Sequence, residues 1–264
     1  MRPTALRRTA VAASVLSLAL LTAACGSDGG DNNKEKDAGK AGSSASAAPA
    51  EKPAAKALTA AELEKASLAQ GDVKGHKITK AGPADAITGD KVTTDKAECD
   101  VFADALMGAK AGTPAASTQR KVMSEPKKPE GKESEDPAEA FKAAFDITTT
   151  LATLATYDGT GAADTLTELR TAATSCASGF SFTAAGSKQK VLKIAEVPVK
   201  GAEEAVGWTV TVQAEGETSA MKLVELRQGG TIASLTSLNL GASGAGGDFD
   251  LPTAVIDAQA AKLA

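Results

Sequence analysis

The chain has 264 residues, with 29 basic and 33 acidic side chains, three cysteines and a single histidine. An acidic net charge of −4 provides no electrostatic basis for binding nucleic acid. Because the single histidine, His76, falls in an expected surface strand, we expect neither a His-dependent triad nor a multi-histidine metal site. Aromatic residues are scarce, so the core has to be built from Ala, Val, Leu and Ile.

The N-terminus has the pattern of a lipoprotein signal. Arginines precede an apolar run at 10–24, and these 15 residues are too few to cross a bilayer, which takes about 20. We therefore expect residues 1–24 to be a secretory signal peptide. The following cysteine, Cys25, with Leu21 four residues before it, resembles the bacterial lipobox, whose cysteine receives a diacylglycerol and acyl chains such as palmitate. The alternative is an ordinary signal with an incidental cysteine.

After cleavage the chain would carry 26 basic and 33 acidic residues, a net charge of −7. An anionic membrane surface would repel it, so we expect the lipid on Cys25 to hold it at the outer face of the cell membrane. Residues 26–57 contain no large apolar side chain. We expect residues 25–57 to be a disordered tether with a reach of roughly 30 Å.

A single folded domain is expected over 58–264. Its first part begins with a capping box, Thr59 and Glu62, and a hydrophobic staple between Leu58 and Leu63. The segment 138–157 is compatible with helix or strand, and we place a strand from about Phe145. The expected elements of this part are a helix at 60–69, a strand at 76–79, polar turns at 81–95, a helix at 96–107, a strand at 116–123, a solvated loop at 124–137 and a helix at 162–175.

From Phe180 the chain reads as strands joined by glycine turns, followed by a helix. The strand at 190–199 has apolar residues at both odd and even positions, so both of its faces would be apolar, which predicts a central position in the sheet. Asp250 is the expected N-cap of the last helix, with Pro252 in its first turn. The expected strands are 180–184, 190–199, 205–214, 218–227 and 230–240, and the expected helix is 251–263.

These elements predict the α+β class, an antiparallel sheet with packed helices. Cys99 and Cys176 remain if Cys25 is lipidated, and each lies in phase with the apolar face of an expected helix. An even pair in an exported chain predicts one disulfide, the alternative being two separate buried thiols.

No motif carries a catalytic, cofactor-binding or metal-binding assignment. Two S-x-x-K matches, Ser187–Lys190 and Ser124–Lys127, have no partner motifs, and the glycine run at 241–245 misses the nucleophile elbow. At Gly159-Thr160-Gly161, a dinucleotide loop would place Asp164 against a pyrophosphate, so a turn before a helix is the better interpretation. The close acidic pairs Glu203-Glu204 and Asp248/Asp250 are expected in turns and caps.

Residues 58–264 resemble actinobacterial lipoproteins with a sensor-like domain, akin to the extracellular domain of PknH-type kinases. This resemblance implies a sheet with helices and binding of an unidentified extracellular ligand instead of catalysis, and it supplies no binding residues. The kinase sensor domains have two disulfides, whereas only one cysteine pair is available here. The segments that carry it are Leu58-Thr59-Ala60-Ala61-Glu62-Leu63, Gly71-Asp72-Val73, the helix with Cys99, the helix ending at Cys176 before Gly179-Phe180, Val224-Glu225-Leu226-Arg227-Gln228-Gly229-Gly230, and Ala258-Gln259-Ala260-Ala261-Lys262-Leu263.

We therefore expect a non-catalytic ligand-binding or sensor-like lipoprotein that contacts an envelope ligand or protein partner and the membrane through its lipid. A lipid or glycolipid carrier is the alternative, and it predicts an apolar cavity of several hundred Å³. A carboxylate-dependent hydrolase is the least favoured hypothesis, because it needs convergent carboxylates with separated pKa values.

Overall fold

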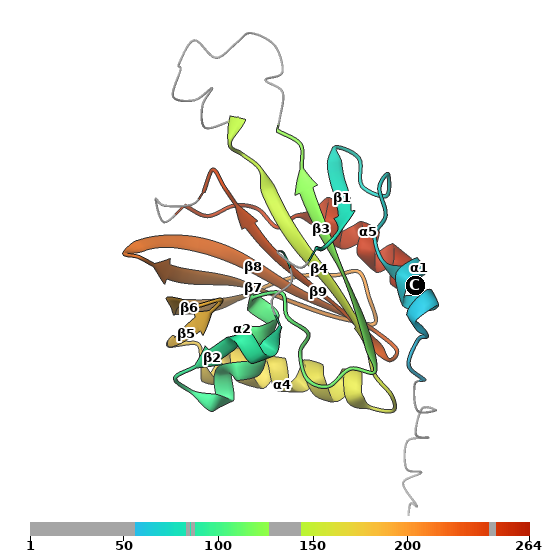
Figure 1. Ribbon diagram of the computed structural model, residues 1–264, viewed down its shortest axis with the longest axis horizontal. Helices are drawn as coiled ribbons and strands as arrows, with labels where there is room; N and C mark the ends of the chain where they lie inside the picture. Colours follow the sequence, from blue (N-terminus) through green and yellow to red (C-terminus); the bar gives the residue numbers. More distant parts are fainter. Residues whose placement is uncertain (1–55, 83–84, 86–87, 127–143, 243–246) are drawn as a thin grey trace, which may run out of the picture. The chain divides into compact units, whose positions relative to one another are not determined.

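An antiparallel sheet of nine strands forms the centre of the folded unit (Figure 1). The computed structural model describes residues 56–82, 85, 88–126, 144–242 and 247–264. The expected signal peptide, Cys25 and nearly all of the tether lie outside the described residues, as does most of the loop expected at 124–137.

The strand order is β1-β3-β4-β9-β8-β7-β6-β5-β2, and every neighbouring pair is antiparallel. Strands β5 to β9 follow one another as a meander, whereas β1 and β2 close opposite edges. The strands are β1 (His76–Lys80), β2 (Val92–Thr94), β3 (Ala116–Ser124), β4 (Thr148–Thr156), β5 (Phe180–Ala184), β6 (Ser187–Val197), β7 (Glu204–Ala214), β8 (Glu217–Gln228) and β9 (Thr231–Asn239).

Helices cover both faces of the sheet (Figure 1). Helices α2 (Asp100–Leu106) and α4 (Gly161–Ser175) lie on one face, which we call face A. Helices α1 (Ala60–Ala66) and α5 (Thr253–Leu263) lie on the other, face B. Short 3-10 turns occupy Gly89–Lys91 and Ala97–Cys99.

The two faces carry separate apolar cores because side chains alternate along each strand. In β8, Leu223 belongs to the face A core, which includes Phe102 and Trp208, and Val224 belongs to the face B core. The rings of Phe102 and Trp208 meet edge to face with centroids 5.4 Å apart. Apolar side chains of α2, α4 and the strands therefore pack against one another on face A.

The predicted fold class is confirmed, and most elements lie where the sequence places them. The Thr59–Glu62 capping box is present, and Leu58 packs against the core cluster that contains Leu63. The turn residues Glu215 and Gly216 both have positive φ, as a two-residue hairpin turn between β7 and β8 requires. In the ambiguous segment the structure has strand from Thr148 to Thr156, and residues 138–143 lie outside the described part.

Four expectations need correction. Helix α1 ends at Ala66, because Ser67 is extended and its hydroxyl bonds back to the Leu63 carbonyl. The turns expected at 81–95 include the short strand β2. Helix α5 begins after Pro252, which occupies the N-cap position, and Asp250 makes no cap. Strand β6 is third from the β2 edge instead of central. A bulge at Leu192 shifts the alternation of side chains, so Val191 and Ile194 lie on the same face although they are three residues apart. This bulge explains why the strand has apolar residues at both odd and even positions.

Cys99 and Cys176 form a disulfide, with both residues fully buried and 6.0 Å between their Cα atoms. Cys99 immediately precedes α2 and Cys176 caps the end of α4. The bond therefore ties together the two helices that cover face A.

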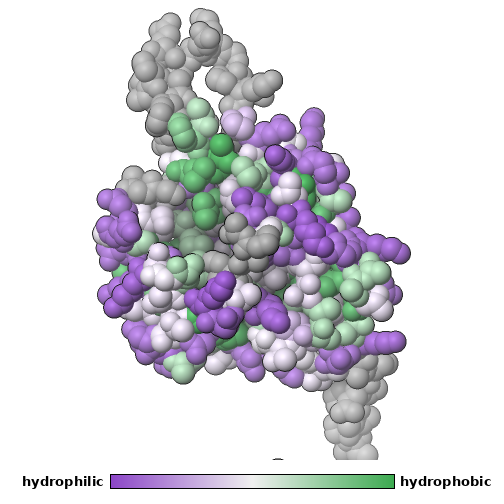
Figure 2. All heavy atoms as spheres, in the orientation of Figure 1, coloured by the Kyte–Doolittle hydropathy of each residue, from purple (hydrophilic) through white to green (hydrophobic). Residues whose placement is uncertain are grey.

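One end of the sheet exposes apolar side chains. Phe145, Leu238 and Leu240 are 46%, 38% and 49% exposed, and the amide of Leu240 donates to the carbonyl of Ile147. Figure 2 shows apolar surface beside polar surface on the side of the molecule seen in Figure 1. This end adjoins residues that the structure leaves undescribed.

Candidate ligand-binding groove

A groove of about 390 Å³ opens where β1 leaves the sheet. Strand β1 pairs with β3 only as far as Arg120, and the Ala81 amide adds one bond to the Gln119 carbonyl. Among the described residues, no strand pairs with the beginning of β3 on that side, so the backbone of Ser117 borders the groove. We call it the edge groove; its lining is Glu64, Lys80, Ala81, Thr88, Gly108, Lys110, Ser117, Thr118, Gln119 and Thr153.

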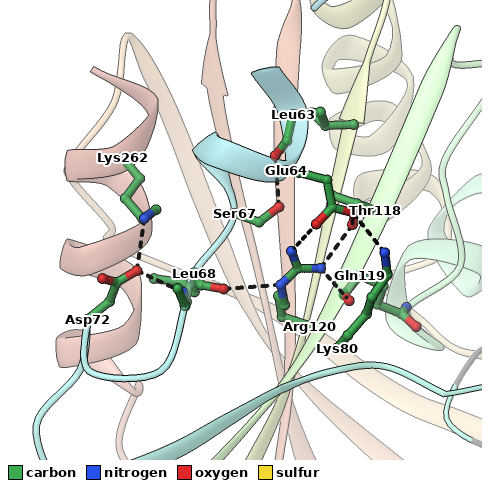
Figure 3. Close-up of polar contacts among 11 residues, drawn as sticks. Leu63, Glu64, Ser67, Leu68, Asp72, Lys80, Thr118, Gln119, Arg120 and Lys262 are labelled. Carbon is green, nitrogen blue, oxygen red and sulfur yellow. Dashed lines mark hydrogen bonds and ion pairs between the residues drawn. The ribbon is translucent and has the colours of Figure 1, made fainter. Parts of the chain in front are cut away.

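Glu64 of α1 is the carboxylate that lines this groove, and it accepts several hydrogen bonds (Figure 3). Its Oε1 accepts from Lys80 Nζ at 3.0 Å and from Thr118 Oγ1 at 2.9 Å, and its Oε2 accepts from Arg120. These hydrogen bonds, from Lys80, Arg120 and Thr118, lower the pKa of the Glu64 carboxyl from 4.5 to about 2. Glu64 is therefore a fixed anion and a poor general acid at neutral pH.

Arg120 anchors this cluster from β3. Only 9% of the residue is exposed, and its Nε donates to the Leu68 carbonyl at 3.1 Å while Nη1 donates to Thr118 Oγ1 at 3.0 Å. The guanidinium thus joins β3, α1 and the segment after α1 (Figure 3). These hydrogen bonds compensate the guanidinium of Arg120 for its loss of contact with water.

On face A the groove continues into a row of polar side chains that crosses four strands. Gln119, Thr153, Ser234 and Glu225 are direct cross-strand neighbours on β3, β4, β9 and β8. Gln119 Nε2 donates to Thr153 Oγ1 at 2.8 Å, and Ser234 Oγ donates to Glu225 Oε2 at 2.6 Å. We call these four residues the polar row. It connects the edge groove with the interior of the sheet.

Both ends of the polar row carry an unpaired oxygen. Gln119 Oε1 and Glu225 Oε1 are buried and lack a hydrogen-bond partner within the described part of the chain. Glu225 is fully buried, and burial raises the pKa of its carboxyl to about 8, partly offset by the hydrogen bond from Ser234. Glu225 is therefore a neutral acid at pH 7.

Residues 105–112, which we call the cover segment, lie over the Gln119 and Thr153 end of the polar row and are also bonded to Thr236 and Tyr157. Thr153 Oγ1 and Gln119 Nε2 both donate to the Gly108 carbonyl, at 2.8 and 2.7 Å. The Ala105 carbonyl accepts from Thr236 at 2.8 Å, and the Ala111 carbonyl accepts from the Tyr157 hydroxyl at 2.7 Å. Burial and the nearby Glu225 raise the pKa of Tyr157, so this hydroxyl stays protonated.

A second groove, of about 620 Å³, lies beside Lys56 and Leu58, at the beginning of the described part of the chain. We call it the terminal groove. Leu58, Ala66 and Leu263 contribute apolar surface to it, Lys56, Lys65 and Lys262 contribute charge, and Gly229-Gly230 contribute backbone. Lys262 is paired with Asp72 at 2.9 Å (Figure 3), and Glu62 is engaged in the capping box.

The weak sequence motifs take structural roles. His76 lies in β1 and its ring contacts the Lys74 carbonyl. Ser187 and Lys190 both lie in β6, Ser124 accepts from the Thr148 amide, and Lys127 is outside the described residues, as are positions 243–245 of the glycine run. The Gly159–Gly161 stretch is a turn before α4, with Asp164 in the first helical turn as predicted.

The close acidic pairs are ion-paired with cations of β8. Glu203 and Glu204 both contact Arg227, and Asp248 contacts Lys222 Nζ at 2.7 Å. Glu203 lies in the bend before β7, as expected, whereas Glu204 is the first residue of β7; Asp248 lies in the loop before α5, and Asp250 is exposed.

Sequence reasoning missed Glu64, Arg120, Gln119 and Glu225. Glu64 and Arg120 are 56 residues apart, and no local pattern indicates that they meet. For Glu225 one signal existed: it lies between Val224 and Leu226 in a strand apolar on both faces, where a carboxylate is unusual.

Within the described residues, no group of three His, Cys, Asp or Glu side chains is arranged to hold a metal ion. Each helix in that part of the chain is too short or too polar to span a bilayer.

No family model matches the chain, and no curated protein matches it. Among solved structures it is similar to the extracellular domain of PknH from Mycobacterium tuberculosis, with a TM-score of 0.45 and 13% identity over 79% of this chain and 95% of that one. It is also similar to an uncharacterised protein from Mycobacterium smegmatis, with a TM-score of 0.33 and 12% identity over 72% of this chain and 90% of that one. At these scores the likeness assigns no function to this chain.

Proposed function

We propose that this chain is a lipid-anchored, non-catalytic ligand-binding domain at the outer face of the cell membrane, with the edge groove as its ligand site. The observation that carries the ligand site is that no strand among the described residues pairs with β3 at Ser117 on this side, where Lys80 and Lys110 border the groove. An unpaired strand edge offers backbone donors and acceptors to an extended peptide.

The anchoring part rests on the sequence around Cys25 and on the buried disulfide. Disulfides form and persist in oxidising compartments, so the Cys99–Cys176 bond supports export of the chain. Lipid on Cys25 would keep the domain at the membrane, where envelope components are its accessible ligands.

The chemistry of the edge groove supports a short peptide with a free carboxylate. Lys110 is exposed, Lys80 has 71% of its side chain exposed and is ion-paired with Glu64, and Glu64 is the single carboxylate among the described residues that line the groove. The groove therefore has a positive rim on an acidic chain. Peptidoglycan fragments, whose peptides bear carboxylates, fit both this chemistry and the proposed location.

The alternatives receive less support. A lipid carrier would need an enclosed apolar cavity, whereas the edge and terminal grooves are open to solvent and have charged residues in their linings. A carboxylate hydrolase would need convergent acids in a cleft. Glu225 is buried inside the sheet, and Asp104, whose pKa burial and the neighbouring Asp100 raise to about 6, lies against Gly89.

Binding of soluble peptidoglycan fragments to the purified full-length chain tests the ligand site. We expect Lys110→Glu to weaken binding by about tenfold through charge reversal at the rim. Lys65→Glu, the same change in the terminal groove, is the matched control and should leave affinity unchanged. Equal affinity for wild type and Lys110→Glu, or loss with Lys65→Glu alone, would contradict the assignment.

A further inference from the structure

The carboxyl of Glu225 is placed where an ionised acid has little to stabilise it. Glu225 is 0% exposed, one oxygen accepts from Ser234, and the other has no hydrogen-bond partner in the described part of the chain. A carboxylate removed from water and given one hydrogen bond is strongly disfavoured against the neutral acid. The Glu225 carboxyl therefore keeps its proton as long as it stays buried.

Two arginines near Glu225 make their hydrogen bonds to other groups, and Asp104 of α2, on the same face of the sheet, is an acid whose own pKa burial raises to about 6. Arg227, two residues along β8, donates to Glu204 and to the Gly229 carbonyl. Arg170 of α4 donates to the Ala205 carbonyl of β7 at 3.5 Å. Tyr157, at the end of β4, is the titratable group whose pKa Glu225 raises. No cation is among the groups that shift the pKa of Glu225.

The cover segment is held down by the same sheet face that contains Glu225. Its carbonyls at Ala105, Gly108 and Ala111 accept from Thr236, from Thr153 with Gln119, and from Tyr157. Gly108 and Lys110 of this segment also line the edge groove. Opening of the cover segment thus gives water a route to the polar row and changes one side of the groove.

We propose that Glu225 is a buried proton switch: with its proton bound it keeps the cover segment closed on the sheet, and release of that proton to solvent favours opening of the segment. That the opening also regulates ligand binding rests on the proposed function of the edge groove. The switch itself does not depend on that function.

The direction of the effect follows from linkage. In the closed state the pKa of Glu225 is about 8, whereas exposure to water returns it to its ordinary value of 4.5. Between these values the open state binds fewer protons, so rising pH favours opening. The equilibrium constant for opening should rise about tenfold per pH unit over this window and level off above it.

Amide hydrogen exchange of the purified full-length chain tests the switch, with rates corrected for the intrinsic effect of pH. We expect protection of residues 105–112 to fall about tenfold per pH unit between pH 5.5 and 7.5 in the wild type. In Glu225→Gln, which cannot ionise, protection should no longer fall between pH 6.5 and 7.5. At lower pH, Asp104 of α2, whose pKa burial raises to about 6, contributes a pH dependence that both proteins share. An equal fall between pH 6.5 and 7.5 in both proteins would overturn the proposal.

Two further measurements cover the case in which Glu225→Gln fails to fold. Infrared spectroscopy of the wild type should show a protonated carboxyl at pH 7 that ionises near pH 8, and its absence at pH 7 would refute the switch. Ser234→Ala removes the hydrogen bond that favours ionisation of Glu225. The pH above which the opening equilibrium of the cover segment stops rising should therefore be higher than in the wild type, and an unchanged or lower pH would count against the proposal.

The switch and the groove can fail independently. If peptidoglycan fragments do not bind but exchange follows pH as expected, the ligand site is wrong and the switch stands. If they bind with an affinity that depends on Lys110 while exchange is independent of pH, the switch is wrong and the groove stands.

Discussion

Arg120 is the residue on which the edge groove is built. Its guanidinium contacts Glu64, the Leu68 carbonyl and Thr118, so three segments of chain depend on one side chain. Removing it leaves the Leu68 carbonyl without this donor and removes one of the three hydrogen bonds to Glu64.

We expect Arg120→Ala to destabilise the chain by about 1–3 kcal/mol, the range for a buried polar group that loses its partner. Lys80→Ala is the matched control, because Lys80 bonds the same carboxylate from a side chain that is 71% exposed. Its effect should stay within about 0.5 kcal/mol. Urea unfolding measures both, and equal effects would show that the buried position of Arg120 is unimportant.

Glu64 and Glu225 make opposite contributions to the pH dependence of folding. The pKa of Glu64 is lowered to about 2, so its stabilisation is present above its unfolded value of 4.5 and is lost as pH falls toward 2. The pKa of Glu225 is raised to about 8, so its neutral form favours folding below 4.5 and that advantage is lost as pH rises toward 8.

We therefore expect the free energy of unfolding of the wild type, relative to Glu225→Gln, to decline by about 1.4 kcal/mol per pH unit between pH 5 and 8. Denaturant titrations of both proteins across this range measure the difference. Glu64→Gln leaves Glu225 in place, so its free energy of unfolding should still decline between pH 5 and 8. Below pH 4.5, its free energy of unfolding should fall less steeply than that of the wild type, because it has no Glu64 carboxylate to protonate. A difference that is constant from pH 5 to 8 would contradict the assignment to Glu225.

At the scale of elements, Gly179 sets the connection between α4 and β5. Its φ is +97°, and a Cβ there would lie 2.4 Å from the Val191 carbonyl oxygen of β6. Neither the backbone conformation nor the neighbouring backbone accommodates a side chain.

Gly179→Ala should consequently cost about 2–4 kcal/mol, through strain and a forced shift of β6. Gly71 provides the control, since its φ of +102° is similar but a Cβ there would meet no atom within 4 Å. Gly71→Ala should cost only the backbone strain, about 1–2 kcal/mol. The midpoints of guanidinium unfolding compare the two, and a smaller loss at Gly179 than at Gly71 would be inconsistent with the close contact.

Elements set by neighbouring residues were predictable from the sequence. The Thr59–Glu62 capping box, the Glu215-Gly216 turn and the apolar phase of α4 each lie within a few residues, and all three are present. Elements set by distant partners were not. Strand β2 has three residues and exists because β5 pairs with it, and the bulge at Leu192 becomes visible only against β7.

The candidate site was unpredictable for the same reason. The edge groove exists because β1 stops at Lys80 while β3 continues to Ala116, which is a property of pairing between strands. The polar row gathers four residues from four strands, spread from position 119 to position 234. A search of the sequence for catalytic spacings could not assemble them.

At the scale of the whole molecule, the proposal combines a membrane anchor at Cys25 with a folded unit stapled by Cys99–Cys176. The anchor part predicts that Cys25→Ser abolishes membrane attachment. Cell fractionation should recover this variant in the soluble fraction and the wild type in the membrane fraction. Cys99→Ser, which leaves Cys25 intact, is the control and should remain membrane-bound; a membrane-bound Cys25→Ser protein would rule out the lipid anchor.

The central claim is that the edge groove binds a ligand from the envelope, and chemical-shift mapping by NMR tests it most directly. The full-length chain, titrated with soluble peptidoglycan fragments, should show saturable shifts at Gly108, Ser117 and Gln119, with smaller shifts along the polar row. Shifts confined to Gly229–Thr231 in the terminal groove, or no saturable shifts at all, would contradict it.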